Sequence, residues 1–221
     1  MTLPRVAAFT DTYLPTVNGV TYTVKTWRDR WEGRGGRMDI VYPNSDHDAD
    51  AGEHPVGSLP FPFYDGFRVG LPQVPDAIQR VDVVHSHTPF GIGLGGYRLA
   101  RDLDAPLVTS YHTPSAEYAE YLSVNGAVEK TIRRTATTYE RAFLNRSAVV
   151  VVPSAKTARH VREEVGVSAD IEVVPNGVDT DFFEPDAGDF RDRFDLPDGP
   201  LIGYTGRHGY EKQLGAIVDA A

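Results

Sequence analysis

Short apolar runs alternate with amphipathic stretches along the first three quarters of the chain. Each run is too short for a helix and ends in polar or turn-forming residues, which is typical of buried parallel strands. The alternation predicts an α/β fold, a Rossmann-like, doubly wound parallel sheet from about Thr2 to Val174. The expected strands are Arg5–Phe9, Met38–Tyr42, a run from Val81 to Ser86, Pro106–Tyr111, Ala148–Val152 and Ile171–Val174. The expected helices are Val20–Trp31, Gly91–Leu103, Val128–Phe143 and a stretch from Ser154 to Val165.

The pattern changes after the last of these strands. The stretch from Asp181 to Pro200 is acidic, contains prolines and lacks periodicity, as an interdomain connection does. We therefore expect one domain over residues 1–175, a linker over 176–200, and over 201–221 the first strand and helix of an incomplete second domain. Most of that second core would be missing, so its apolar residues should be poorly buried or covered by self-association. These residues are Leu201, Ile202, Leu214 and Ile217.

Composition narrows the functional classes. With 31 acidic and 22 basic residues, the formal net charge of -9 disfavours unspecific binding to nucleic acid. An acidic surface with little lysine is typical of proteins from a salt-rich cytoplasm, but an ordinary acidic protein explains this composition equally well. Cysteine is absent, which excludes disulfides and thiolate metal sites. Without a leader pattern or an apolar run of membrane-spanning length, we expect a cytoplasmic protein.

Histidines follow two neighbouring strands at their carboxyl ends. One strand runs into His85-Ser86-His87-Thr88, and the next ends at His112-Thr113. In doubly wound sheets, ligands bind in the crevice beside such strand ends. A His-x-His pair on a strand shares one face, as metal ligands do, but no carboxylate or cysteine cluster completes a metal site here, so none is predicted. For His85 we expect a buried structural role.

The loop from Thr10 to Gly19 precedes the first helix. Free backbone N–H groups and the helix dipole favour an anion such as a phosphate at this position. Ordinary turn chemistry of Asn18-Gly19 is the alternative explanation. The segment lacks the G-x-G-x-x-G fingerprint, so neither a nicotinamide nor another cofactor is predicted.

The expected helix from Val128 to Phe143 is basic in an otherwise acidic protein. Its cations include Lys130, Arg133 and Arg134, on faces away from the apolar stripe. Such a helix could face anionic lipid headgroups on the inner side of a membrane, or could simply present a solvated surface.

Five segments together resemble family-4 retaining glycosyltransferases of the GT-B fold, and most resemble the enzymes that glycosylate diacylglycerol or related lipids. They occur in the family's order: Phe9–Pro15 with Asn18-Gly19-Val20, His85–Phe90, Tyr111-His112-Thr113, Val174–Asp179, and Gly206-Arg207 with Glu211-Lys212.

This resemblance implies specific roles. His87 would contact the donor sugar near the reacting carbon, whereas Gly19, Arg207 and Lys212 would hold the donor diphosphate. The acceptor side would include Asp11, Tyr13, His112 and Thr113. The substrates would be a nucleotide sugar such as UDP-glucose or GDP-mannose and a lipid or glycan acceptor. Hexose transfer would retain the anomeric configuration.

The chain also departs from the family pattern. His208 and Gln213 replace the usual leucine-like and glycine residues, and the Glu-x7-Glu segment that binds sugar and ribose would lie beyond Ala221. We therefore expect residues 1–221 alone to be inactive. Two alternatives remain at this point: a GT-B nucleotide-sugar epimerase, and a non-catalytic fragment that binds the acceptor or a lipid.

Overall fold

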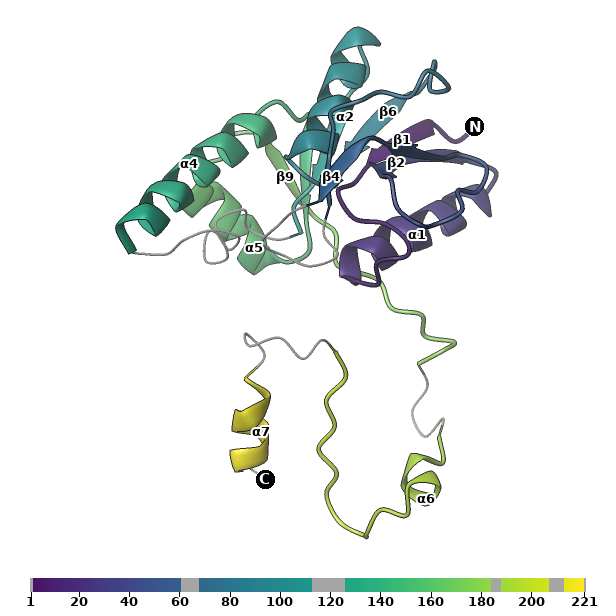
Figure 1. The fold of residues 1–221 in the computed structure, drawn as a ribbon, viewed down its shortest axis with the longest axis vertical. Helices are drawn as coiled ribbons and strands as arrows, with labels where there is room; N and C mark the ends of the chain where they lie inside the picture. The colour runs from purple at the N-terminus through teal and green to yellow at the C-terminus, as the bar shows by residue number, and fades with distance from the viewer. Residues whose placement is uncertain (1, 61–67, 113–125, 184–187, 207–212, 221) are drawn as a thin grey trace. The chain divides into compact units, whose positions relative to one another are not determined.

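The computed structural model describes residues 2–60, 68–112, 126–183, 188–206 and 213–220 (Figure 1). The chain forms two compact units, Met1–Asn176 and Gly177–Ala221.

A seven-stranded sheet forms the centre of the first unit. Its strand order is β3-β2-β1-β6-β7-β8-β9, and every neighbouring pair in it is parallel. This confirms the Rossmann-like α/β fold predicted from the sequence. The strands are β1 (Arg5–Phe9), β2 (Arg37–Pro43), β3 (Glu53–Val56), β6 (Val83–Ser86), β7 (Leu107–Ser110), β8 (Val149–Val152) and β9 (Asp170–Val173).

The order of the strands reverses between β1 and β6. From β1 the chain adds β2 and β3 on one side, and from β6 it adds β7, β8 and β9 on the other. Between the two halves, the proline-rich segment forms a separate antiparallel pair, β4 (Ser58–Pro60) with β5 (Arg68–Gly70). The reversal defines a switch point at the carboxyl ends of β1 and β6, where doubly wound sheets bind ligands.

Helices cover both faces of this sheet. Successive strand residues point to opposite faces, and Phe9 packs in one apolar cluster with Ile92 of α2, whereas Ala8 packs in another with Val24 of α1. The helices in the described residues of this unit are α1 (Gly19–Glu32), α2 (Gly91–Asp102), α4 (Gly126–Leu144) and α5 (Ala155–His160), which continues into a π-helical turn, η2 (Val161–Val165).

Helix α2 approaches the sheet closely because its buried face includes Gly93, Gly95 and Gly96. A Cβ atom added at Gly96 would lie 2.9 Å from Cγ of Phe9, and one added at Gly93 would lie 1.9 Å from the carbonyl oxygen of Thr88. Any side chain there would have to displace β1 or the turn after β6. The glycines therefore set the position of that turn.

In its described residues, the second unit contains two short helices, α6 (Phe190–Arg193) and α7 (Leu214–Ala220). The strand expected from Leu201 is not formed in the described residues 201–206, because no second strand pairs with them. Leu201 is 52% and Ile202 65% exposed. Leu214 and Ile217 of α7 are partly exposed.

Candidate functional site

The candidate site lies at the carboxyl ends of β1, β6 and β7. The backbone N–H of His87 donates a 2.8 Å hydrogen bond to the carbonyl of Phe9, which continues the pairing of β6 with β1 into the turn. His112 follows β7 in the same way, after Tyr111, whose backbone N–H donates to Val151 of β8. Adjacent parallel strands thus place the predicted histidines side by side.

Three histidines form a continuous stack across these strand ends. The ring centroids of His85 and His87 are 4.2 Å apart, and those of His87 and His112 are 5.3 Å apart with an interplanar angle of 9°. Nδ1 of His87 lies 3.0 Å from Nε2 of His112, and Nε2 of His85 lies 2.8 Å from Oγ of Ser110. Trp27 of α1 stacks on His85 at 5.4 Å.

Burial keeps this stack neutral. Desolvation lowers the pKa of His85 to about 3, helped by the proximity of His112. Desolvation also lowers the pKa of His87 well below its usual value, with His85 and His112 adding repulsion, and lowers the pKa of His112 to about 4. Each ring therefore carries one N–H and one lone pair at neutral pH, and acts as a hydrogen-bonding group and not as a cation.

The second ring nitrogen of His87 has no partner in the described part of the chain. His87 is 6% exposed, and its Nε2 atom is buried without a hydrogen bond. A buried polar atom left unpaired costs about 1–3 kcal/mol, so native structures seldom contain one without a functional reason. Among these histidines, His87 is the one whose ring has a buried nitrogen left unpaired in the described residues.

Asp11 links the loop after β1 to the start of α2. One of its carboxylate oxygens accepts a hydrogen bond from Oγ1 of Thr88, and the other accepts one from the backbone N–H of Ile92 at 3.4 Å. Phe90, at the N-cap of α2, makes no side-chain capping bond, so Asp11 takes this role from another strand. Burial raises its pKa to about 6, although the two hydrogen bonds oppose that shift.

The start of α1 has open space in front of it. Asn18 caps the helix by accepting hydrogen bonds from the backbone N–H groups of Val20 and Thr21, both at 2.9 Å. Its amide nitrogen donates to Oγ1 of Thr12 at 2.7 Å, which fixes the loop. Gly19 is exposed, and a Cβ atom added there would meet nothing within 4 Å. Nothing in the described part of the chain therefore requires a glycine at position 19.

Tyr13 points into a buried polar network and not into open solvent. It is 4% exposed, and its hydroxyl donates a 2.8 Å hydrogen bond to Glu53. The same carboxylate accepts from Arg28 and lies 2.8 Å from Nε2 of His47. Burial alone would raise the pKa of Glu53, but hydrogen bonds from the Asp50 backbone, Tyr13 and His47, with the charge of Arg28, lower it. The acceptor-side role of Tyr13 stays a prediction.

The basic helix α4 meets the site through Tyr139, whose hydroxyl donates to the carbonyl of Pro89 in the turn after β6. Lys130 and Arg134 are exposed, and Arg133 is half-buried. Beside them the helix borders an apolar hollow of about 380 Å³, lined by Thr131, Ile132, Thr135, Ala136 and Tyr139.

Three predicted site residues, Thr113, Arg207 and Lys212, lie outside the described residues. Sequence reasoning missed Trp27, Ser110 and the linking role of Asp11. The sequence did contain a signal for Trp27, because this aromatic residue lies on the helix that follows the first strand at the switch point. Within the described ranges, no group of three or more His, Asp or Glu side chains is arranged to hold a metal, and no helix has the length and apolarity that crossing a membrane demands.

Comparison with known proteins identifies the family. Residues 17–182 match Glycosyltransferase Family 4. The chain belongs to this family. This confirms the resemblance drawn from the sequence motifs, and the match includes the Asn18-Gly19 loop, the histidine stack and helix α4.

Among curated relatives, the chain is 27% identical to an alpha-monoglucosyldiacylglycerol synthase of Streptococcus pneumoniae, over 98% of this chain and 52% of that protein. It is 28% identical to a GDP-mannose-dependent alpha-mannosyltransferase of Mycolicibacterium smegmatis, over 95% of this chain and 58% of that protein. The chain thus spans little more than half the length of these relatives. A solved sucrose-phosphate synthase of Thermosynechococcus elongatus shares the fold, with a TM-score of 0.69 and 17% identity over 98% of this chain and 59% of that one.

Proposed function

We propose that this chain forms the acceptor-side part of a retaining glycosyltransferase that moves a hexose from a nucleotide sugar to a lipid or another hydroxyl acceptor. The membership of family 4 supports the transferase class. The names of two relatives specify a diacylglycerol glycolipid and a GDP-mannose donor. Both names carry the prefix alpha, which supports retention where the donor sugar is itself the α anomer.

The observation that carries the proposal is the buried, unpaired Nε2 atom of His87 at the switch point. Its other nitrogen is held by His112, so the ring orientation is fixed before a ligand arrives. A neutral imidazole in this position can exchange one hydrogen bond with a sugar hydroxyl. Because Nε2 is buried, the sugar reaches it only after a neighbouring group moves.

A neutral His87 suits a retaining transfer. The acceptor hydroxyl attacks the face that the leaving diphosphate occupies, so a diphosphate oxygen can take the proton and the protein needs no strong base. The protein must orient the sugar and stabilise the charge that grows on the diphosphate. His87, held by His112, would provide orientation, and its lowered pKa keeps it from competing for the proton.

The diphosphate would lie against the start of α1. The N–H groups and dipole of a helix N-terminus favour an anion, and Gly19 leaves the backbone accessible there. On the second domain, Arg207 and Lys212 would add two cations to neutralise the leaving group. The donor is a substrate, and the proposal includes no further cofactor.

The acceptor would approach past Asp11, His112 and Thr113, beside helix α4. The exposed Lys130 and Arg134, together with Arg133, would place this helix against anionic lipid on the inner face of the cell membrane. The adjacent apolar hollow supports such a position, because a lipid acceptor carries both a polar head and acyl chains.

The test is transfer of radiolabelled hexose from UDP-glucose or GDP-mannose to diacylglycerol, by the complete protein encoded by the reading frame that contains this chain. We expect an α-linked glycolipid, and we expect residues 1–221 alone to give none. A β-linked product would overturn retention. Interconversion of the sugar nucleotide without transfer would instead identify an epimerase, and acceptor binding without turnover would identify a binding protein.

A further inference from the structure

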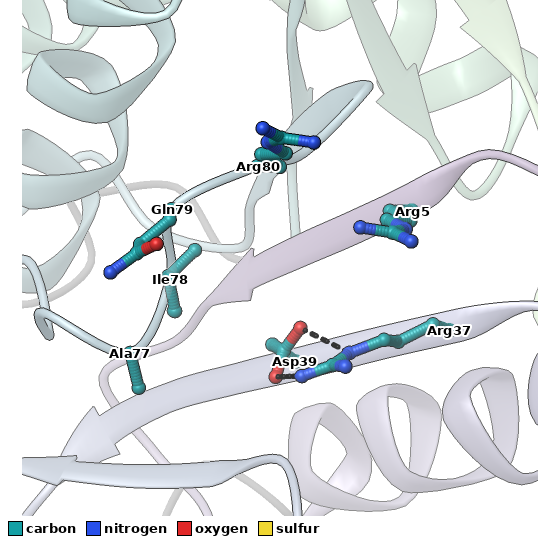
Figure 2. Close-up of a pocket in the computed structure, with 7 residues that line it drawn as sticks. All are labelled: Arg5, Arg37, Asp39, Ala77, Ile78, Gln79 and Arg80. Atoms are coloured by element: carbon teal, nitrogen blue, oxygen red, sulfur yellow. Dashed lines mark hydrogen bonds and ion pairs between the residues drawn. The ribbon is translucent and has the colours of Figure 1, made fainter.

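A separate pocket lies at the amino ends of β1 and β2, on the side of the sheet opposite the histidine crevice. Its volume is about 160 Å³, and its walls include Arg5, the first residue of β1, and Arg37, the first residue of β2 (Figure 2). The remaining lining residues are Asp39, Ala77, Ile78, Gln79 and Arg80. Since β1 and β2 are parallel, their first residues share the amino edge of the sheet, opposite the crevice that holds His87.

The lining is strongly basic in an acidic protein. Three arginines and one aspartate leave an excess of positive charge there, in a chain whose formal net charge is -9. They come from three separate segments, the starts of β1 and β2 and the loop before β6. Cations brought together by different segments repel one another unless an anion lies between them.

Asp39 neutralises only one of these arginines. Its two oxygens accept hydrogen bonds from Nε and a terminal nitrogen of Arg37, at 3.1 and 3.2 Å. One of them also lies 3.0 Å from Nε2 of His54. Burial would raise the pKa of Asp39, but Arg37 and His54 outweigh it and the pKa is lowered. Both carboxylate oxygens are thus engaged, which reduces their repulsion of another anion.

Arg5 and Arg80 keep their charges uncompensated. Within the described ranges, neither guanidinium group makes a hydrogen bond or ion pair. The main chain of Arg5 is held by Asp82: its N–H donates to a carboxylate oxygen of Asp82 at 2.7 Å, and its carbonyl accepts from the Asp82 N–H at 2.8 Å. Ile78, which is 6% exposed, anchors the loop that carries Gln79 and Arg80. In the described residues, the pocket therefore offers two unpaired guanidinium groups and one side-chain amide, and the loop that carries Gln79 and Arg80 is held in place by Ile78.

We propose that this pocket binds a phosphoryl group, either inorganic phosphate or the headgroup of an anionic phospholipid. Planar guanidinium groups match the oxygen geometry of phosphate and can donate two parallel hydrogen bonds each. The bound group would compensate the positive charges of Arg5 and Arg80, which line the same pocket. This site is independent of the proposed transferase function, because it shares no residue with the crevice.

The experiment is a titration of the ¹⁵N-labelled chain with inorganic phosphate, followed by NMR at constant ionic strength. We expect saturable shifts of the amides of Arg5, Gln79 and Arg80. The double variant R5Q/R80Q should raise the Kd at least tenfold. The control R159Q/R162Q removes the same charge from exposed positions on α5 and η2, and should leave the Kd unchanged. If the double variant does not fold, R80Q alone replaces it.

A second arm separates the two sources of the phosphoryl group. Vesicles of phosphatidylcholine with and without phosphatidate are sedimented with each variant. Loss of phosphatidate binding in R5Q/R80Q, without any binding of free phosphate, would assign the site to a headgroup. Equal affinities for phosphate in R5Q/R80Q and R159Q/R162Q, or shifts confined to Asn18–Val20, would overturn the proposal.

Discussion

Nδ1 of His87 lies 3.0 Å from Nε2 of His112, so the two rings share one proton. Since both rings are neutral, the position of that proton fixes whether the free Nε2 of His87 donates or accepts. His112 is therefore expected to act as a positioning residue for His87. The pair turns two adjacent strand ends into a single hydrogen-bonding unit.

Replacing His87 tests the role of this unit in the complete protein. His87→Ala should lower kcat by about ten- to a thousand-fold, the effect of losing one donor to the transition state. Nucleotide affinity should hardly change. His160→Ala, a control on α5 whose histidine pairs with Glu164, should leave kcat unaltered. An unchanged kcat with lost nucleotide binding in His87→Ala would remove His87 from the sugar site.

The histidine stack predicts a loss of stability in mild acid. The native histidines stay neutral down to about pH 4, whereas in the unfolded chain they protonate near pH 6.5. The unfolded state thus binds more protons between these values, so the free energy of unfolding falls as the pH falls from 6.5 towards 4. Each neutral histidine contributes about 1.4 kcal/mol per pH unit. Urea denaturation across this range measures the slope, which His112→Gln should reduce.

Asp11 should produce the opposite slope. Its folded pKa of about 6 lies above the unfolded value of 3.8, so the native state binds more protons between these values. Its contribution is therefore fully present below pH 3.8 and is lost as the pH rises through 6. Asp11→Asn should remove this contribution and make the net rise of stability with pH steeper. A slope identical to that of the unmodified chain would mean that Asp11 titrates normally.

The sheet and the neighbouring histidines at its strand ends could be predicted from the sequence, whereas the contacts of Asp11 and Tyr13 could not. The apolar run Val149–Val152 and its equivalents give strands without any knowledge of their neighbours, because burial on both faces leaves a direct pattern. The separation of Asp11 from Thr88 by 77 positions leaves no such local pattern. Strand order alone brings them together. For the same reason, no local signal linked Tyr13 to Glu53.

The buried network of Tyr13, Arg28 and His47 around Glu53 makes the stability of the fold sensitive to substitution of Glu53. Its carboxylate compensates the charge of Arg28, and both side chains are nearly buried, at 3% and 10% exposure. Glu53→Leu should lower the free energy of unfolding by about 3–5 kcal/mol, because it removes the closer carboxylate partner of the buried Arg28 guanidinium group and leaves it only the more exposed Glu32, at 3.4 Å, and the carbonyl of Ala51. Asp29→Asn, which breaks an exposed pair with Lys25, should change it by less than about 1 kcal/mol. Chemical denaturation compares the two; equal effects would contradict the network's role.

Helix α4 gives a test of membrane contact. R133E/R134E should weaken sedimentation with anionic liposomes, since each cation near anionic lipid contributes about 1 kcal/mol at low salt. R159E/R162E reverses the same charge elsewhere and should bind as the unmodified chain does. Because the phosphoryl pocket lies on other elements, R5Q/R80Q is included in the same assay. Unchanged binding of R133E/R134E would count against α4 as the membrane-facing surface.

Two glycines separate a structural requirement from a functional one. Gly93→Ala should destabilise the fold, because its Cβ atom would lie 1.9 Å from the carbonyl oxygen of Thr88. Gly19→Ala should leave the melting temperature unchanged or raise it slightly, since its Cβ atom meets nothing within 4 Å and alanine favours helix more than glycine does.

Gly19→Ala should instead affect the binding of the donor. If the diphosphate approaches the backbone at Gly19, the added methyl group obstructs it, and the affinity of the complete protein for the nucleotide sugar should fall without a loss of stability. Calorimetric titration with UDP-glucose or GDP-mannose measures this affinity. A Gly19→Ala protein that binds the donor as tightly as the unmodified one would place the diphosphate away from the start of α1.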